Sequence, residues 1–227
     1  MLISEDRKFL FIAVPKTGTT SIEIHLQKLD PSIRRNSVPL PGGKWVTVHK
    51  HARAGDIKNM MGPRMNEYTV IAFMREPVSA VISKYYYYKM GRGAKRARHA
   101  KFDSRGILNK MKTVSAQILP IRLWALVYPY SMTHEFVLGQ SGALLVDEIG
   151  NFDKLEEDFV KIFSKFGFDA NNLALPVANR SGYSVKRHAE DNLLKKIIAW
   201  RCSVDRRIFD DCASEKRSVP ANRGQGL

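Results

Sequence analysis

The first apolar run of the chain and the turn that follows it constrain the fold more than any other segment. Residues 9–14 are FLFIAV, with no polar interruption. A run of this length is typical of a strand that is buried on both faces, as in a parallel sheet. Residues 15–21 then supply one lysine, one glycine and four hydroxyl side chains, and Ile22, Leu26 and Leu29 recur at helical spacing. The sequence therefore predicts a strand, a turn and a helix in direct succession.

A turn between a buried strand and a helix is a place where an anion can bind. The N–H groups of the turn and the helix N-terminus point to one spot, which suits a phosphate or a sulfate. Lys16 precedes Gly18, whereas the lysine of a Walker A loop directly follows its second glycine. The alternative to an anion site is an ordinary turn in which Thr19, Thr20 or Ser21 caps the helix.

A second strand and helix repeat this layout. Residues 69–74 form another strand-like run, which ends at Arg75-Glu76-Pro77. Pro77 suits the first turn of a helix, and Ser83 follows Arg75 by about two helical turns. We therefore expect Arg75 and Ser83 to converge on a further phosphate. The alternative for Arg75 is a surface ion pair.

Together the two segments resemble the motifs of the sulfotransferase family, whose donor is 3′-phosphoadenosine 5′-phosphosulfate (PAPS). The first is similar to the family's 5′-phosphosulfate loop and the second to its 3′-phosphate motif. The matching residues are Pro15, Lys16, Thr17, Gly18, Thr19 and Thr20 in the first, and Arg75, Pro77 and Ser83 in the second. Ser21 stands where members that act on small phenols and steroids usually carry tryptophan. Serine at this position is more like the carbohydrate sulfotransferases.

Two later segments are similar to the same carbohydrate branch. Residues 149–159 resemble its G-R-Y/F-E-x-L-x-x-D-F segment, and residues 175–181 resemble its L-P-x-x-N-x-S segment. Asn151 and Asp153 stand where an arginine and a glutamate are usual, so the pattern gives no support for a structural ion pair at these positions. The resemblance spans roughly residues 7–210. It implies an enzyme that transfers a sulfuryl group from PAPS to a hydroxyl of a carbohydrate acceptor.

The resemblance also implies roles for individual residues. Lys16 would contact the sulfate and the bridging oxygen, while the N–H and hydroxyl groups of the loop would hold the 5′-phosphate. Arg75 and Ser83 would hold the 3′-phosphate, which ATP lacks. Two pairs of residues further along the chain are candidates for closing over the nucleotide: Arg180 with Ser181, or Lys186 with Arg187.

The transfer needs a base for the acceptor hydroxyl, and histidine is the natural base near neutral pH. By analogy with phosphoryl transfer, positioning and electrostatics supply most of the remaining catalysis. Among the six histidines, His49 and His51 lie between the two donor motifs, where the family places its catalytic histidine. The K-H-x-x-A pattern of residues 50–54 resembles the bacterial carbohydrate members, so His51 is the first candidate and His49 the second. Alternation along a strand would put both on one face, and the alternative is that both are ordinary polar residues at a strand end.

Alternating strands and helices predict an α/β fold, a three-layer sandwich with a central parallel sheet. The expected strands lie near residues 9–14, 69–74 and 143–147, and the expected helices near 19–29, 77–90, 152–166 and 189–210. We expect a single domain over residues 1–212 and a flexible basic tail over 213–227.

The net charge and the number of cysteines limit which kinds of ligand and partner the chain is expected to bind. A formal net charge of +15 attracts polyanions, including the anionic donor and an acidic glycan. The basic stretch over residues 84–101 is either a groove or arm for such a ligand, or a solvated helix end and loop. Two cysteines cannot form a disulfide framework, and no spacing suggests a metal. With neither a signal peptide nor a membrane span, the sequence predicts a cytoplasmic protein.

Two other functions compete with a sulfotransferase. A nucleotide kinase-like P-loop enzyme would bind ATP with Mg²⁺, but the Walker A order is missing. A non-catalytic polyanion-binding protein on the same fold would bind glycans or nucleic acid with a steep salt dependence, yet would not need Lys16, Arg75, Ser83 and His51. No specific nucleic-acid partner is predicted, and the sequence leaves the acceptor and the oligomeric state open.

Overall fold

A computed structural model describes residues 1–90, 104–127, 132–175, 188 and 190–213 of the chain. The chain forms two compact units. Unit 1 contains residues 1–75, 132–180 and 207–227, and unit 2 contains residues 76–131 and 181–206. The single domain expected over residues 1–212 stays a prediction. The expected tail lies, apart from Ala213, outside the described residues, as do residues 91–101 of the basic stretch.

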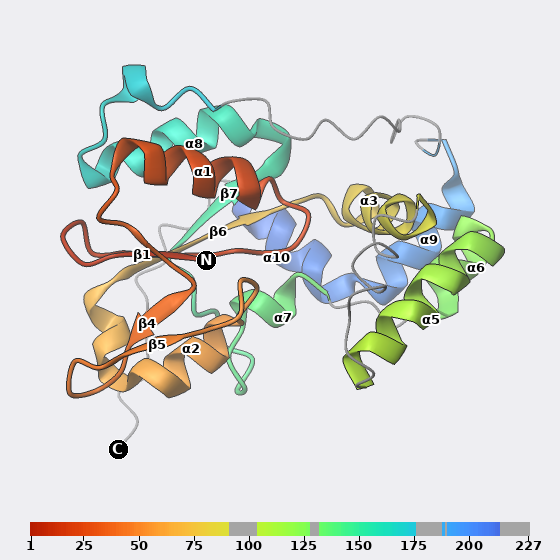
Figure 1. The fold of residues 1–227 in the computed structure, drawn as a ribbon. Coiled ribbons are helices and arrows are strands. Elements are labelled where there is room, and N and C mark those ends of the chain that lie inside the picture. The colour runs from red at the N-terminus through yellow and green to blue at the C-terminus, as the bar shows by residue number, and fades with distance from the viewer. Residues whose placement is uncertain (91–103, 128–131, 176–187, 189, 214–227) are drawn as a thin grey trace. The chain divides into compact units, whose positions relative to one another are not determined.

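The centre of unit 1 is a mixed five-stranded sheet with helices on its faces (Figure 1). The strand order is β3-β1-β2-β6-β7. Its strands are β1 (Leu2–Ser4), β2 (Phe9–Ile12), β3 (Arg34–Arg35), β6 (Thr69–Met74) and β7 (Glu148–Asn151). The three strands β2, β6 and β7 are parallel, as predicted, whereas β1 runs antiparallel to both β2 and β3. The predicted central parallel sheet is therefore confirmed in part: it is parallel in its middle strands, but it is mixed because a connection as short as residues 5–8 joins β1 to β2 only as a hairpin.

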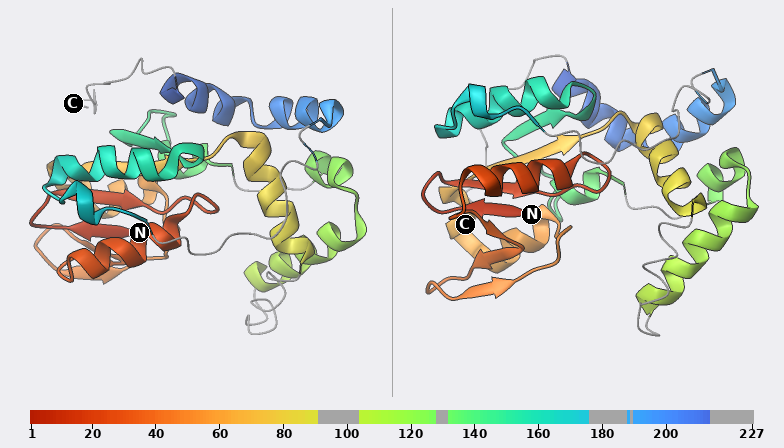
Figure 2. Two further views of the ribbon diagram at one scale, coloured as in Figure 1. Left: turned by 90° about the horizontal axis from the view of Figure 1, so that it is seen from above. Right: turned by 45° about the horizontal axis from the view of Figure 1, so that its top comes forward.

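Both faces of this sheet are buried, since successive side chains of a strand point to opposite sides. Phe9 and Phe11 of β2 pack on one face against α1 (Thr19–Leu29) and α8 (Leu155–Phe163). Leu10 and Ile12 pack on the other face. There they meet α2 (Ala54–Met61), α7 (His134–Val137) and the end of α10 (Ser203–Ala213). The turned views of Figure 2 show α1 and α8 side by side over the first face. The uninterrupted apolar run thus has the two-sided burial that its pattern predicted.

Several predicted elements have the expected bounds, and one strand does not. The strand over residues 69–74 and the helix over residues 19–29 are confirmed as β6 and α1, and β2 ends at Ile12. The strand predicted near residues 143–147 is wrong, because β7 begins at Glu148. The carboxylate of Asp147 accepts the N–H of Val70 at 2.7 Å, so a side chain takes the place of a main-chain acceptor just before the ladder starts.

The remaining elements of unit 1 are short. A two-stranded antiparallel sheet is formed by β4 (Ser37–Pro39) and β5 (Trp45–Thr47). The helix expected near 152–166 is divided into a 3₁₀ turn, α8 and a second 3₁₀ turn. The 3₁₀ segments in the described part of unit 1 are η1 (Gly62–Glu67), η2 (Phe152–Lys154), η3 (Ser164–Phe166) and η4 (Ala170–Asn172).

Unit 2 is helical in its described residues. Its helices are α3 (Pro77–Lys89), α5 (Ser104–Ile118), α6 (Ile121–Val127) and α9 (Asn192–Arg201), and α3 packs against the other three. The ring of the buried Trp124 lies 5.4 Å from that of Tyr85, whose hydroxyl donates to the carbonyl of Leu119. The helix expected near 77–90 is confirmed as α3, whereas the one expected near 189–210 is two helices that meet at Cys202. Within the described residues, no helix has the length and apolar character needed to cross a membrane.

Candidate functional site

The turn between β2 and α1 has a left-handed backbone on both sides of Thr17. Lys16 has a φ of 73° and Gly18 a φ of 71°. The Thr17 hydroxyl is buried and donates to the carbonyl of Val14 at 2.9 Å. Turns of this kind bring successive N–H groups together into a concavity that suits an anion. The lysine and the glycine of the predicted loop are therefore the residues that shape its backbone.

The start of α1 differs from the ordinary capped helix that was the alternative. Gly18 is the N-cap, and no side chain among the described residues caps the helix there. Thr19 and Ser21 are buried, while Thr20 is half-buried and its hydroxyl accepts a hydrogen bond from Lys50. The first turn of a helix has N–H groups without intrahelical partners, so this end of α1 can receive an anion.

Gly18 is closely packed and has a left-handed backbone, so a larger residue at this position would be strained. A Cβ atom at this position would lie 2.8 Å from Cδ2 of Leu155 and 3.2 Å from Cε2 of Phe152. The guanidinium of Arg75 also lies over the ring of Phe152, 4.5 Å from the ring centroid. Phe152, which sequence reasoning gave no role, thus contacts both the loop and the arginine of the second motif. In the sequence, Phe152 could have been identified from its position next to Asn151, in the segment that resembles the carbohydrate branch.

The segment around Asn151 has a local reason for its departures from the family pattern. The Asn151 side chain accepts the N–H of Asp153 at 2.8 Å and so caps η2, while its own N–H donates to the carboxylate of Asp158. Gly150 precedes it, and a Cβ atom there would lie 2.3 Å from the ring of Phe73. Close packing of β7 on β6 therefore requires the glycine of this motif.

The remaining donor candidates lie in different parts of the chain. Pro15 and Lys16 are half-buried in the turn. Arg75 follows the carboxyl end of β6 in unit 1, whereas Ser83 is a buried residue of α3 in unit 2. Their convergence on one phosphate stays a prediction. The four residues expected to close over the nucleotide lie outside the described residues: Arg180, Ser181, Lys186 and Arg187.

His51 is held in the tautomer that a general base needs. Its Nδ1 lies 2.6 Å from the carbonyl oxygen of Ala13, at the end of β2. Because a carbonyl only accepts, Nδ1 carries the hydrogen and the neutral ring has its lone pair on Nε2. Burial lowers the pKa of His51; the hydrogen bond to Ala13 opposes this, and the charges of Lys50 and the Met1 amino group add to the lowering. The ring is therefore neutral and able to accept a proton at neutral pH.

His49 has the opposite arrangement. Its Nδ1 accepts the backbone N–H of His51 at 3.1 Å, so its neutral ring carries the hydrogen on Nε2. A ring in that tautomer donates at Nε2 and cannot take a proton there. Both histidines follow β5, which ends at Thr47, so the strand alternation expected to place them on one face does not apply. The geometry favours His51 over His49 as the base.

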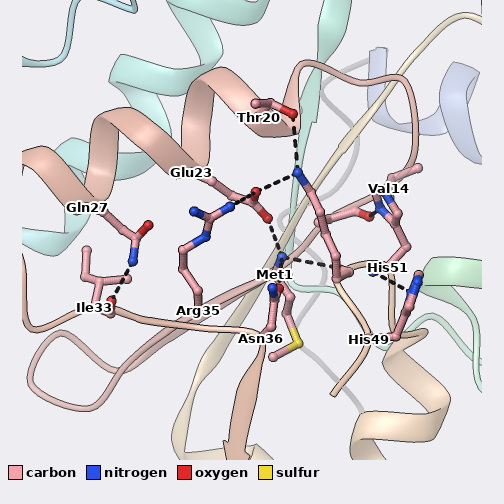
Figure 3. A network of polar contacts seen from close by, with 12 residues as sticks. Met1, Val14, Thr20, Glu23, Gln27, Ile33, Arg35, Asn36, His49 and His51 are labelled. Atoms are coloured by element: carbon pink, nitrogen blue, oxygen red, sulfur yellow. Dashed lines mark hydrogen bonds and ion pairs between the residues drawn. The ribbon is translucent and has the colours of Figure 1, made fainter. Parts of the chain in front are cut away.

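A buried carboxylate connects the histidine segment to α1 (Figure 3). Glu23 of α1 is fully buried, and its Oε2 lies 2.8 Å from Nζ of Lys50 and 3.2 Å from a guanidinium nitrogen of Arg35. Its Oε1 pairs with the amino group of Met1. Burial raises the pKa of Glu23, but the hydrogen bonds and charges of Lys50 and the Met1 amine outweigh burial and hold the pKa below its usual range.

Lys50 connects the two parts of the candidate site, the start of α1 and the histidine segment. It pairs with Glu23, donates to the Thr20 hydroxyl at 3.3 Å and precedes His51 in the chain. Three cationic groups around one carboxylate make the first turns of α1 electropositive, which favours a bound anion. Sequence reasoning did not predict the Lys50–Glu23 pair. The signal for Glu23 was its place three residues before Leu26, on the buried side of an amphipathic helix.

A surface pocket among the described residues of unit 1 lies away from these residues. It has a volume of about 520 Å³ and is lined by Lys8, Tyr68 and Thr69 among others, at the amino end of β6. Arg75 follows the opposite end of that strand. The pocket is therefore separate from the candidate site.

The candidate site thus combines a turn whose backbone suits an anion, the cations Lys16 and Lys50, and a neutral histidine whose tautomer is fixed. Among the described residues, no group of three or more His, Cys, Asp or Glu side chains could hold a metal ion. Searches of protein-family models, curated proteins and solved structures found no match to the chain.

Proposed function

We propose that this chain is a PAPS-dependent sulfotransferase that sulfates a hydroxyl of a carbohydrate acceptor. The hydrogen bond between His51 and Ala13 carries the proposal. Ala13 precedes the Lys16–Gly18 turn by only a few residues, so the base and the anion-binding turn share one piece of backbone. A base fixed beside an anion site is the arrangement that transfer of a charged group to a hydroxyl requires.

In this mechanism the acceptor oxygen attacks the sulfur while Nε2 of His51 takes the hydroxyl proton. The bond between the sulfur and the bridging oxygen breaks, and 3′,5′-ADP leaves with the bonding electron pair. Lys16 neutralises the charge that develops on the bridging oxygen, and the N–H groups at the start of α1 hold the 5′-phosphate. His51 then has the proton, which it releases to solvent.

Donor selection rests on Arg75. A guanidinium binds phosphate through paired hydrogen bonds, and the stacking of Arg75 on Phe152 orients it. ATP has no 3′-phosphate and would leave Arg75 without that ligand. By the resemblance, Ser83, Arg180 and Ser181 are further candidate donor-binding residues of this proposal.

The carbohydrate nature of the acceptor rests on the resemblance at Ser21 and in the two later segments. The net charge of +15 adds an attraction for an acidic glycan.

Calorimetric titration of the chain with 3′,5′-ADP, 5′-ADP and ATP with Mg²⁺ tests the donor. We expect 3′,5′-ADP to bind most tightly, and Arg75→Ala to weaken it by at least about tenfold without changing 5′-ADP binding, as removal of a charge-assisted contact would. Arg34→Ala is the matched control, since Arg34 is also an arginine stacked on an aromatic ring, that of Trp45.

Two results would contradict the proposal. A preference for ATP with Mg²⁺ would favour a kinase-like enzyme. Equal binding of 3′,5′-ADP and 5′-ADP, unaffected by Arg75→Ala, would favour a polyanion-binding protein.

A further inference from the structure

Helix α5 turns an apolar face to solvent and buries small residues instead. Met111, Val114 and Ile118 are 64%, 50% and 72% exposed, whereas Thr113 and Ala116 of the same helix are buried. The spacings of three and four residues put the exposed side chains on one face. A surface helix of a globular protein normally has the reverse arrangement, so this face fits a binding surface rather than a core.

Helix α6, which follows α5 in the chain, also exposes apolar side chains to solvent. Leu123, Leu126 and Val127 of α6 are exposed, while Trp124 and Ala125 are buried in unit 2. Helices α5 and α6 contact each other and are consecutive in the chain. Two adjoining helices therefore present large apolar side chains to solvent.

The charge of α5 and α6 indicates which kind of partner binds their exposed apolar side chains. The two helices contain four basic residues, Arg105, Lys110, Lys112 and Arg122, and no Asp or Glu occurs from Ser104 to His134. Apolar side chains on a helix whose charged residues are all basic are typical of helices that lie in the interface of an anionic membrane. A second copy of the chain fits less well, because a symmetric contact of these two helices would bring basic residues against their own copies, and Arg122 already pairs with Asp191 of its own chain.

We propose that α5 and α6 form a surface that binds an anionic lipid bilayer, with Met111, Val114 and Ile118 inserted at headgroup depth. The proposal goes beyond the sulfotransferase function and is independent of it. It requires no membrane span, because an interfacial helix lies in the plane of the membrane.

Co-sedimentation of the full chain with lipid vesicles tests this surface. The vesicles are phosphatidylcholine alone, or phosphatidylcholine mixed with phosphatidylglycerol. We expect binding to the mixed vesicles only, and the triple variant Met111→Ser/Val114→Ser/Ile118→Ser to bind at least about tenfold more weakly. Lys110→Gln and Lys112→Gln should each weaken binding roughly fivefold, the equivalent of about 1 kcal/mol per basic residue near an anionic surface.

The matched control is Ile24→Ser/Met60→Ser, which removes two exposed apolar side chains from unit 1 and should leave vesicle binding unchanged. Circular dichroism checks that every variant is folded. The proposal is overturned if the chain stays in the supernatant with mixed vesicles, if it binds phosphatidylcholine equally well, or if the triple variant binds like the control. Light scattering that shows a dimer dispersed by the triple substitution, without vesicle binding, would assign the surface to a second copy. Binding of 3′,5′-ADP reports on the proposed function separately.

Discussion

At the scale of single residues, the hydrogen bonds of two neighbouring histidines give them different chemistry. His51 donates from Nδ1 to a carbonyl and keeps a lone pair on Nε2, whereas His49 accepts at Nδ1. The two side chains are two positions apart in the sequence and have the same intrinsic basicity. Their partners alone decide which one can act as a base.

The pKa of His51 is therefore expected to lie below the usual histidine value of about 6.5. As the pH falls below about 6.5, the unfolded chain takes up this proton before the folded chain does. The stability contributed by the neutral ring is complete above that pH and is lost as the pH falls through the folded pKa. NMR titration of the histidine Cε1–H signals, assigned with His51→Ala, measures the value. A midpoint at or above 6.5 would contradict the proposed environment.

Glu23 is expected to contribute more stability than any exposed carboxylate. Glu23→Gln keeps the shape of the side chain but leaves three cationic groups without their counter-ion. Breaking a buried ion pair from one side costs about 3–5 kcal/mol, and we expect a loss in this range in the free energy of unfolding by urea. Glu67→Gln is the control, because Glu67 is exposed and lies 3.6 Å from Lys8; its effect should stay within about 0.5 kcal/mol. Equal effects of the two substitutions would show that the Glu23 network adds no stability.

At the scale of elements, three adjacent parallel strands carry the segments that make up the candidate site. Strand β2 leads into the Lys16–Gly18 turn, its neighbour β6 leads to Arg75, and β7, which pairs with β6, leads to Phe152. The carboxyl ends of parallel strands meet at one edge of a sheet, which is where α/β folds bind ligands. Phe152 fills the space between the turn at Gly18 and the guanidinium of Arg75.

Phe152→Leu should therefore weaken the binding of 3′,5′-ADP while leaving that of 5′-ADP unchanged. Leucine keeps an apolar contact with the turn but removes the ring that orients Arg75. Loss of a cation–π contact of about 1 kcal/mol predicts a roughly fivefold lower affinity by calorimetry. Phe166→Leu, another partly buried aromatic of unit 1, is the control. If both nucleotides weaken together, Phe152 supports the turn rather than Arg75.

At the scale of the whole molecule, the formal net charge of +15 sets the balance between attraction and self-repulsion. It favours association with anionic donors, glycans and lipid surfaces. The same charge destabilises the folded chain, because like charges lie closer together in the compact state than in the unfolded one.

Added salt should therefore raise the melting temperature. Screening of net repulsion on going from low to moderate NaCl is expected to raise Tm by a few degrees, since about 1 kcal/mol corresponds to about 2–4 °C for a chain of this size. Scanning fluorimetry with NaCl and with choline chloride separates screening from binding of a particular cation. A Tm that falls with salt would mean that favourable ion pairs, such as those of Glu23, outweigh the repulsion.

Local pattern was sufficient to predict the parts of this protein that depend on neighbouring residues. The apolar run of β2, the periodicity of α1 and the bounds of β6 follow from side-chain alternation and helical spacing. The Lys16–Gly18 turn was also visible, because strand, turn and helix are consecutive in the chain.

The tertiary structure alone decided the features that depend on residues distant in sequence. The antiparallel pairing of β1 makes the sheet mixed, and the carboxylate of Asp147 sets where β7 begins. The carbonyl of Ala13 fixes the tautomer of His51, and Lys50 reaches the buried Glu23. Each of these is a hydrogen bond or ion pair whose partner no local periodicity reveals, because its geometry exists only once the chain has folded.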